Sequence, residues 1–311
     1  MKKQSKKVAQ KNILVIGDIH CPFDLKGYRE HCIEMYNKYN CNQVVFIGDI
    51  IDNHYSSYHE TDTGALGATD ELQYAIDKIA LWYEAFPNAD VCIGNHDALI
   101  ARKAQSGGIP EQWLRDYSDV LGTPGWTFGT DFIYNDVRYT HGHKSSKART
   151  ASKRDMMSTV TGHFHTDFYL EYNFGMNHNI FAMAVGSGVD DKCYAVKYAA
   201  GGKKSAIGCG VVLEDGTQPI LCPMDLSKWK GLPDYQPINK KTEERVTNRE
   251  VKTGGYKANP KHGSQRVILD TETGIEYNKQ TIVAELLGIS SGHLSSMLNG
   301  RVKNKTSFRY I

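Results

Sequence analysis

Short apolar runs alternate with amphipathic stretches over the first third of the chain. The runs are rich in β-branched residues and free of polar ones, which is typical of parallel strands buried on both faces. They lie at 13–16, 44–47 and 91–93. Between them, apolar residues recur at helical spacing over about 26–40 and 70–86, and Pro87 ends the second stretch. The pattern predicts a β-α-β-α-β arrangement around a parallel sheet.

The pattern changes after Gly125. We expect one more helix over 111–121, between Pro110 and Gly122, and mostly strands beyond it. The expected strands are 126–128, 132–134, 137–140, 160–162, 168–172, 180–185, 194–198, 207–213 and 219–221. Alternating strands and helices followed by a run of strands predict an α/β sandwich whose second sheet is mixed.

The last part of the chain predicts a small separate module. Residues 226–264 are polar and contain several prolines and glycines, which indicates a linker, although it is long enough for part of it to pack against the core. Residues 265–311 combine a hairpin over 267–277 with two helices at 280–287 and 291–300, the spacing of a helix-turn-helix. The expected divisions are a basic tail at 1–11, a main domain at 12–225, the linker at 226–264 and the module at 265–311.

Five polar clusters occur in the first two thirds of the chain, and the first three directly follow the apolar runs. They are Asp18-Ile19-His20, Gly48-Asp49-Ile50-Ile51-Asp52, Gly94-Asn95-His96-Asp97, Thr140-His141-Gly142-His143 and Gly162-His163-Phe164-His165. Open α/β sheets bind ligands at the carboxyl ends of their strands. One such cluster alone would be an ordinary turn, because Gly and Asp are favoured there. Together the clusters offer the ligands of a two-metal phosphoesterase site.

The mixture of ligand types indicates which metals suit the site. Two divalent cations about 3.5–4 Å apart need an anionic ligand between them, and Asp49 is the natural bridge. Carboxylates mixed with imidazoles suit first-row transition ions better than Ca²⁺ or Mg²⁺. We therefore expect two divalent transition-metal ions, with Mn favoured and Fe, Zn or Ni as alternatives.

In order and composition the clusters resemble those of the calcineurin-like metallophosphoesterases, over roughly residues 13–213. The resemblance implies a four-layer αββα sandwich with mixed sheets. It implies one metal held by Asp18, His20, Asp49 and His165, and a second held by Asp49, Asn95, His141 and His163. It further implies that His96 stabilises the transition state or protonates the leaving oxygen, that Asp97 holds the His96 ring, and that a metal-bound hydroxide is the nucleophile.

Two positions depart from the protein phosphatases of this superfamily. Those enzymes carry Arg after the last Asp of the second cluster and Glu at the end of the third, where this chain has Asn53 and Asp97. The departure favours the phosphodiesterase and nuclease branches. The segment 54–60 would then either face the substrate, with a base stacked on Tyr55 or Tyr58, or be a solvated loop. Candidate substrate contacts are Asn53, His54, Tyr55, His143, Lys144 and Lys147.

Charge is unevenly distributed behind a formal net charge of +2. Residues 226–311 hold 15 Lys and Arg against 8 Asp and Glu, whereas residues 1–225 hold 22 against 27. A basic appendage on an acidic domain favours a polyanionic partner. A basic patch over 144–154 would either grip a phosphate backbone or form a solvated helix face.

The C-terminal module resembles the hairpin and helix-turn-helix modules appended to phage and intron-encoded nucleases, and the chain would then be a phage-like member of its family. A protein-interaction module is the alternative. On this resemblance, DNA contacts are expected from Ser291, His293, Ser295, Ser296, Arg301, Lys303 and Lys305.

Composition limits the remaining classes of protein. There is no run of about 18 apolar residues, and the basic start lacks the apolar stretch of a signal peptide, so we expect a cytoplasmic protein with no membrane partner. Seven cysteines without a Cys-x-x-Cys pair indicate reduced thiols. The sequence favours a metal-dependent nuclease that hydrolyses DNA phosphodiesters. The alternatives are a phosphatase or phosphodiesterase for a small nucleotide or phosphoprotein, and a DNA-binding regulatory protein with a structural metal site; the oligomeric state is left open.

Overall fold

The chain divides into two compact units, Met1–Val246 and Thr247–Ile311. The computed structural model describes residues 11–58, 65–142, 147–194, 204–229, 268–270, 276–277, 291–299, 306 and 308–310. The basic tail at 1–11 and the expected linker at 226–264 therefore fall almost wholly outside the described residues. The first four residues of that linker form a short 3₁₀ helix, η4 (Leu226–Trp229).

The first sheet has six strands in the order β11-β10-β1-β2-β3-β4. They are β1 (Ile13–Ile16), β2 (Gln43–Phe46), β3 (Ala89–Cys92), β4 (Trp126–Gly129), β10 (Gly208–Leu213) and β11 (Gln218–Pro223). Strands β1 to β4 are parallel, whereas β10 is antiparallel to β1 and β11 to β10. Helices α1 (Tyr28–Lys38) and α2 (Ala68–Ala85) connect β1 to β2 and β2 to β3, which confirms the expected β-α-β-α-β arrangement.

The second sheet has five strands in the order β5-β6-β7-β9-β8. They are β5 (Asp131–Tyr134), β6 (Val137–Thr140), β7 (Ser158–Thr161), β8 (Phe168–Gly175) and β9 (His178–Val185). Strands β6, β7 and β9 are parallel, and the edge strands β5 and β8 are antiparallel to their neighbours. Helix α5 (Ala148–Asp155) connects β6 to β7 and packs on β7 and β9. Both sheets are therefore mixed.

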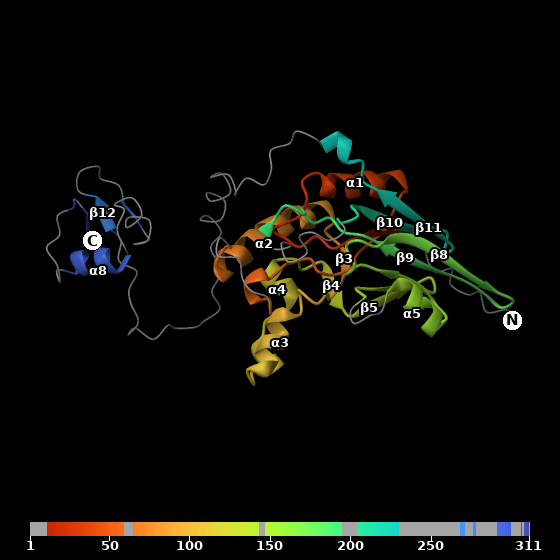
Figure 1. The fold of residues 1–311 in the computed structure, drawn as a ribbon, viewed down its shortest axis with the longest axis horizontal. Coiled ribbons are helices and arrows are strands. Elements are labelled where there is room, and N and C mark those ends of the chain that lie inside the picture. Colours follow the sequence, from red (N-terminus) through yellow and green to blue (C-terminus); the bar gives the residue numbers. More distant parts are fainter. Residues whose placement is uncertain are drawn as a thin grey trace, which may run out of the picture. The chain divides into compact units, whose positions relative to one another are not determined.

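Alternate side chains of β1 enter two different cores. Leu14 and Ile16 belong to the core that β1 shares with α1 and α2. Ile13 and Val15 pack instead with Tyr139 and other residues of the second sheet. Because both faces are covered, every residue of β1 is buried, which explains a strand without a polar position. The layers follow as helices, sheet, sheet and helix (Figure 1), confirming the four-layer α/β sandwich.

Two helical segments of the first unit differ from the sequence prediction. The single helix expected over 111–121 is a 3₁₀ turn, η2 (Glu111–Trp113), and a separate helix, α4 (Tyr117–Leu121). Leu114 has an extended backbone, with φ −89° and ψ 147°. The break places the Tyr117 hydroxyl where it donates to the Asp97 carbonyl at 3.1 Å, so a tertiary hydrogen bond outweighs local helix propensity.

Helix α3 (Leu99–Ser106) follows β3 and the third polar cluster, and the sequence pattern did not predict it. Its buried residues are Leu99 and Ala104, and most of its other residues are exposed. The apolar periodicity was therefore too weak to indicate a helix. Tyr194, expected to open a strand, lies outside any strand, and the rest of that expected strand is outside the described residues.

The second unit contains a three-stranded sheet in the order β13-β12-β14. Strand β12 (Ile268–Asp270) pairs antiparallel with β13 (Glu276–Tyr277), which confirms the expected hairpin pairing. Strand β14 (Phe308–Tyr310) was not expected and pairs with the other edge of β12. Helix α8 (Ser291–Leu298) matches the second expected helix, whereas the first, at 280–287, lies outside the described residues. None of the helices described in either unit is long and apolar enough to cross a membrane.

Candidate metal centre

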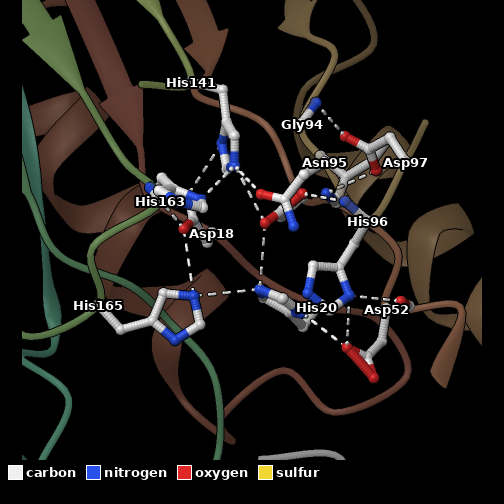
Figure 2. A network of polar contacts seen from close by, with 12 residues as sticks. Asp18, His20, Asp52, Gly94, Asn95, His96, Asp97, His141, His163 and His165 are labelled. Carbon is white, nitrogen blue, oxygen red and sulfur yellow. Dashed lines mark hydrogen bonds and ion pairs between the residues drawn. The ribbon is translucent and has the colours of Figure 1, made fainter. Parts of the chain in front are cut away.

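The five polar clusters directly follow β1, β2, β3, β6 and β7, so three come from the first sheet and two from the second. Their side chains converge on one space between the layers. Figure 2 shows the rings of His141, His163, His165 and His20 directed toward one another, with Asp18 among them. The fold therefore brings together ligands that lie far apart in the chain, such as His20 and His165, which are 145 residues apart.

Glycine is required where the strand ends approach closely. A Cβ at Gly48, whose φ is +111°, would lie 2.6 Å from His141 Nδ1. A Cβ at Gly94 would overlap the Asp49 carboxylate, and one at Gly162 would overlap that of Asp18. The glycines of the clusters therefore leave the space that the neighbouring ligands occupy.

Three of the expected ligands adopt left-handed backbone conformations. The φ angles of His20, Asp49 and His163 are +46°, +47° and +65°. Such conformations cost roughly 1–2 kcal/mol for residues with a Cβ. They turn the chain sharply at the strand ends, where the ligand side chains leave the sheet.

One group of ligand atoms joins Asp18, His20 and His165. The Nε2 atom of His165 lies 3.2 Å from Asp18 Oδ2 and 3.1 Å from His20 Nε2. All three ligand atoms lie within 4.8 Å of one another. These are three of the four residues that the resemblance implied for the first metal.

A second group joins Asp49, His141 and His163, again within 4.8 Å of one another. His141 Nε2 lies 3.1 Å from Asp49 Oδ2, 3.2 Å from His163 Nδ1 and 3.0 Å from Asn95 Oδ1. Asp49 Oδ2 also lies 3.7 Å from His20 Nε2 of the first group. Asp49 is therefore the carboxylate between the two groups, in the position expected of a bridging ligand.

The chemistry of these donor sets fits two divalent cations. Two pairs of imidazole nitrogens face each other at 3.1 and 3.2 Å, an arrangement that needs a proton or a cation between lone pairs. Asp18 Oδ1 is buried without a hydrogen-bond partner, which is costly for an ionised carboxylate. Mixed imidazole and carboxylate oxygen donors are the ligands of first-row divalent metals. Asp18, His20, Asp49 and His165 would hold one ion, and Asp49, Asn95, His141 and His163 the other.

His96 lies beside these groups and is held by Asp52. Its Nδ1 atom is 2.7 Å from the Asp52 carbonyl oxygen and 3.2 Å from Asp52 Oδ1. Burial opposes protonation of His96, but the Asp52 hydrogen bond and the charges of Asp49 and Asp52 outweigh burial and raise its pKa to about 10. The ring is therefore protonated near neutral pH when the neighbouring carboxylates carry their charges.

The role expected for Asp97 is wrong, because Asp52 contacts the His96 ring instead. Asp97 Oδ1 accepts hydrogen bonds from the N–H groups of Ile50 and Ile51, at 3.0 and 3.2 Å, and its Oδ2 accepts one from Gly94 at 2.8 Å. Asp97 thus ties the second cluster to the third. The motif Gly-Asp-x-x-Asp already contained Asp52, but sequence spacing could not tell which ring it faces.

A cavity of about 470 Å³ opens over the metal ligands. Its lining residues come from the clusters, from the segment after η1 (His54–Ser56) and from α3. They are Asp49, Ser57, Tyr58, Asn95, His96, Leu99, Arg102, His163, Phe164, His165 and Thr166. Sequence reasoning considered Tyr58 but missed Arg102, whose helix carried little apolar signal.

Three expected substrate contacts do not line this cavity. Asn53 donates its side-chain amide to the His96 carbonyl at 3.0 Å, so it positions the third cluster. His54 is buried and packs edge-on against Tyr194, with ring centroids 5.1 Å apart. Tyr55 is 53% exposed. The lining instead includes Tyr58, three residues further along the same loop.

The other expected substrate contacts belong to the basic stretch after β6. Lys147 Nζ binds Asp167 Oδ2 at 2.8 Å and stands 4.7 Å from the centroid of the Phe164 ring, and Lys147 is not among the residues that line the cavity. His143 and Lys144 lie outside the described residues. The basic side chains of α5 are paired with carboxylates; the pairs are Arg149–Glu171, Lys153–Glu171 and Arg154–Asp155. The patch therefore matches a solvated helix face better than a free phosphate grip.

The expected DNA contacts fall on α8 and on the residues after it. Ser291, His293, Ser295 and Ser296 all lie on this helix. Ser295 Oγ accepts a hydrogen bond from Asn299 Nδ2 at 3.3 Å. Arg301, Lys303 and Lys305 are outside the described residues. DNA binding by this unit stays a prediction.

Residues 11–190, more than half of the chain, match the calcineurin-like phosphoesterase family, Metallophos. The chain belongs to this family and is a metal-dependent phosphoester hydrolase by class. A comparison with curated proteins found no significant match.

Several solved structures resemble the chain at low sequence identity. Vacuolar protein sorting 29 from Cryptosporidium parvum is 13% identical, with 68% of this chain and 88% of that chain covered and a TM-score of 0.38. Yfce, a phosphoesterase from E. coli, is 13% identical, with 68% and 99% covered and a TM-score of 0.32. Vps29 from Chaetomium thermophilum is 13% identical, with 68% and 86% covered and a TM-score of 0.32. At these values the likeness carries no functional argument, and family membership rests on the sequence match.

Proposed function

We propose that this protein is a nuclease that hydrolyses phosphodiester bonds of DNA, with Mn²⁺ as the favoured metal. The observation that carries the proposal is the pair of ligand groups sharing Asp49 beneath an open cavity. When bound, two divalent cations supply Lewis acidity at the phosphoryl oxygens and lower the pKa of water to the neutral range.

The residues around the ligands supply the remaining chemistry. His96 lines the cavity, and its Nδ1 is held by Asp52. Its Nε2 is then the nitrogen that donates a proton to the leaving oxygen or a hydrogen bond to the phosphoryl group. Asp49 Oδ1 also accepts a hydrogen bond from the backbone N–H of His96 at 2.8 Å. This bond fixes the backbone of His96 to the carboxylate that lies between the two ligand groups.

The preference for DNA rests on the second unit and on charge. Residues 226–311 carry 15 Lys and Arg against 8 Asp and Glu, and the described part of this segment contains the hairpin and α8 of the expected helix-turn-helix. Polyanion binding by basic appendages is a general electrostatic effect. Asn53 and Asp97, in place of the Arg and Glu of protein phosphatases, favour a diester over a phosphoprotein.

Cleavage of labelled single- and double-stranded DNA by the full-length protein in Mn²⁺ tests the proposal. Cleavage by the wild type and none by Asp49→Asn is the expected result, because the variant lacks the anionic bridge. His96→Gln should retain metal and lose about 10²–10⁴-fold in rate. If the fully metallated wild type cleaved neither single- nor double-stranded DNA, this result would contradict the proposed nuclease function.

The second candidate is hydrolysis of a small nucleotide ester. It is favoured by the size of the cavity, about 470 Å³, which suits a small ligand, and by a lining drawn wholly from the first unit. Two results together would favour this candidate. A chain truncated after Val246 would hydrolyse a small diester at the rate of the full chain, and neither the truncated nor the full chain would cleave DNA.

A further inference from the structure

Two aromatic side chains line the cavity next to the metal ligands, and a cation stands over each ring. Tyr58, from the loop after β2 of the first sheet, has the guanidinium carbon of Arg102 5.3 Å from its ring centroid. Phe164, from the loop after β7 of the second sheet, has Lys147 Nζ 4.7 Å from its centroid. One aromatic residue from a loop of each sheet therefore lines the cavity.

The two aromatic walls differ in charge. Lys147 is bound to Asp167 at 2.8 Å, so the Phe164 wall carries no net charge. Arg102 and Lys103 both stand near the Tyr58 ring, and Lys103 Nζ lies 5.5 Å from its centroid. The described residues of the Tyr58 wall therefore bring two cationic side chains together, although several carboxylates lie in the adjoining metal centre.

The Tyr58 wall is also open to a ligand. Its ring is 60% exposed, and both Tyr58 and Arg102 line the cavity directly. An exposed aromatic face stacks on a base of any sequence, and a guanidinium offers paired donors that match a phosphate. A nucleotide is the substrate fragment that carries a flat ring and an anionic phosphate side by side.

We propose that Tyr58 and Arg102 form a nucleotide subsite next to the metal centre. The base stacks on Tyr58, and Arg102 binds the phosphate adjacent to the one being hydrolysed. The inference rests on the proposed phosphodiesterase function and narrows its substrate to a strand of at least two phosphates. Phe164 then stacks on the part of the substrate that lies on the other side of the scissile phosphate, and it binds no phosphate there.

The test compares two substrates of the full-length protein in Mn²⁺. One is a thymidine trinucleotide, which has a base and a second phosphate for the subsite. The other is bis(p-nitrophenyl) phosphate, which has no second phosphate. The quantity measured is the ratio of kcat/KM for the trinucleotide to kcat/KM for the aryl diester, with KM and kcat determined separately.

Arg102→Ala should lower this ratio about tenfold or more, chiefly through a higher KM, because a charge-assisted contact to phosphate is lost. Tyr58→Leu should lower it about fivefold or more through lost stacking. Tyr58→Phe keeps the ring and should change the ratio less than about twofold. Arg115→Ala removes the same charge from an exposed residue outside the cavity lining and is the matched control.

The possible outcomes test the proposed subsite and the proposed phosphodiesterase function separately. A ratio unchanged in both Arg102→Ala and Tyr58→Leu, with wild-type activity on both substrates, would overturn the subsite and leave the phosphodiesterase intact. An equal fall of the ratio in Arg115→Ala would also overturn the subsite, since it would show a general charge effect. A metallated wild type inactive on both substrates would overturn the phosphodiesterase and the subsite together.

Discussion

Asp52 holds two histidines with a single carboxylate oxygen. Its Oδ1 lies 2.9 Å from His20 Nδ1 and 3.2 Å from His96 Nδ1. Burial opposes ionisation of Asp52, but its hydrogen bonds with His20 and His96 outweigh burial and keep its pKa below the usual range. The Nε2 atoms of both rings are consequently left for the metal centre and the cavity, as is common for outer carboxylates of metal sites.

We predict that Asp52→Asn lowers kcat about 10–100-fold and weakens metal binding by a similar factor, since the neutral amide cannot hold both rings as the carboxylate does. Metal content by mass spectrometry and rates on a small diester check it. Asn53→Ala is the control, because the Asn53 side-chain amide donates to the His96 carbonyl and not to its ring, and its loss should cost activity far less. Equal rates in Asp52→Asn and the wild type would show that His96 needs no carboxylate partner.

Glu71 is a buried carboxylate on α2 with a structural role. Its Oε1 accepts the His54 N–H at 2.6 Å, and Oε2 is buried without a hydrogen-bond partner. Burial, with a smaller contribution from the charge of Asp52, raises the pKa of Glu71 from 4.5 to about 7. Folding therefore favours its protonated form, so its contribution to stability is present below pH 4.5 and is lost as pH rises to about 7.

Glu71→Gln should remove this pH dependence, because the amide is neutral throughout and still accepts the His54 N–H. The quantity to compare is the free energy of unfolding of the variant minus that of the wild type. After allowance for solvent screening, this difference should be about 1–2 kcal/mol larger above pH 7 than below pH 4.5. Urea denaturation at several pH values measures the difference. Curves that stay parallel for the two proteins would contradict the prediction.

Among the elements, α1 is attached to the first sheet partly through the Tyr28 hydroxyl. The Tyr28 hydroxyl donates to the Gly208 carbonyl at 2.7 Å and accepts the Gly17 N–H at 3.0 Å. Its ring fills the space over Gly188, where a Cβ would overlap it. Gly17 immediately precedes the first candidate metal ligand, Asp18, so the helix also supports the first polar cluster.

Tyr28→Phe should destabilise the protein by about 1–3 kcal/mol, because two buried backbone groups lose their partner. Tyr36→Phe on the same helix is the matched control; among the residues that the structure describes, no hydrogen bond of its hydroxyl is found, and its loss should cost less than about 0.5 kcal/mol. Chemical denaturation of both variants provides the comparison. Equal losses would mean that the Tyr28 hydrogen bonds add nothing to the packing of its ring.

At the scale of the whole first unit, the metal centre joins the two sheets. Asp18, His20 and Asp49 come from strands of the first sheet, whereas His141 and His165 follow strands of the second. The core between the sheets is apolar, whereas the ligand cluster at this end is charged and contains residues from both sheets. Cations bound there would cross-link the layers and stabilise the native state by mass action.

Metal removal should accordingly lower Tm. For one site filled at about 100 times its Kd, the stabilisation is about 2.7 kcal/mol, which corresponds to roughly 5–11 °C for a unit of this size. Differential scanning fluorimetry with EDTA and with Mn²⁺ measures the shift. Asp49→Asn should respond to Mn²⁺ much less, and an equal response in variant and wild type would place metal binding elsewhere.

The accuracy of the sequence prediction differed between elements for a physical reason. The strands β1 and β2 were recognised because burial on both faces leaves only apolar residues. Helix α3 was missed because its exposed surface shows little periodicity. The break at Leu114 was missed because it depends on a tertiary hydrogen bond of Tyr117.

By itself, the sequence determined the strands of the two larger sheets, the two-layered sheet arrangement and the ligand clusters at the strand ends, because residue type and spacing are local properties. The tertiary structure alone decided that Asp52 rather than Asp97 holds His96, and that Tyr58 and Arg102 line the cavity. Those facts depend on which loops meet after the sheets have packed, and 44 residues separate Asp52 from His96.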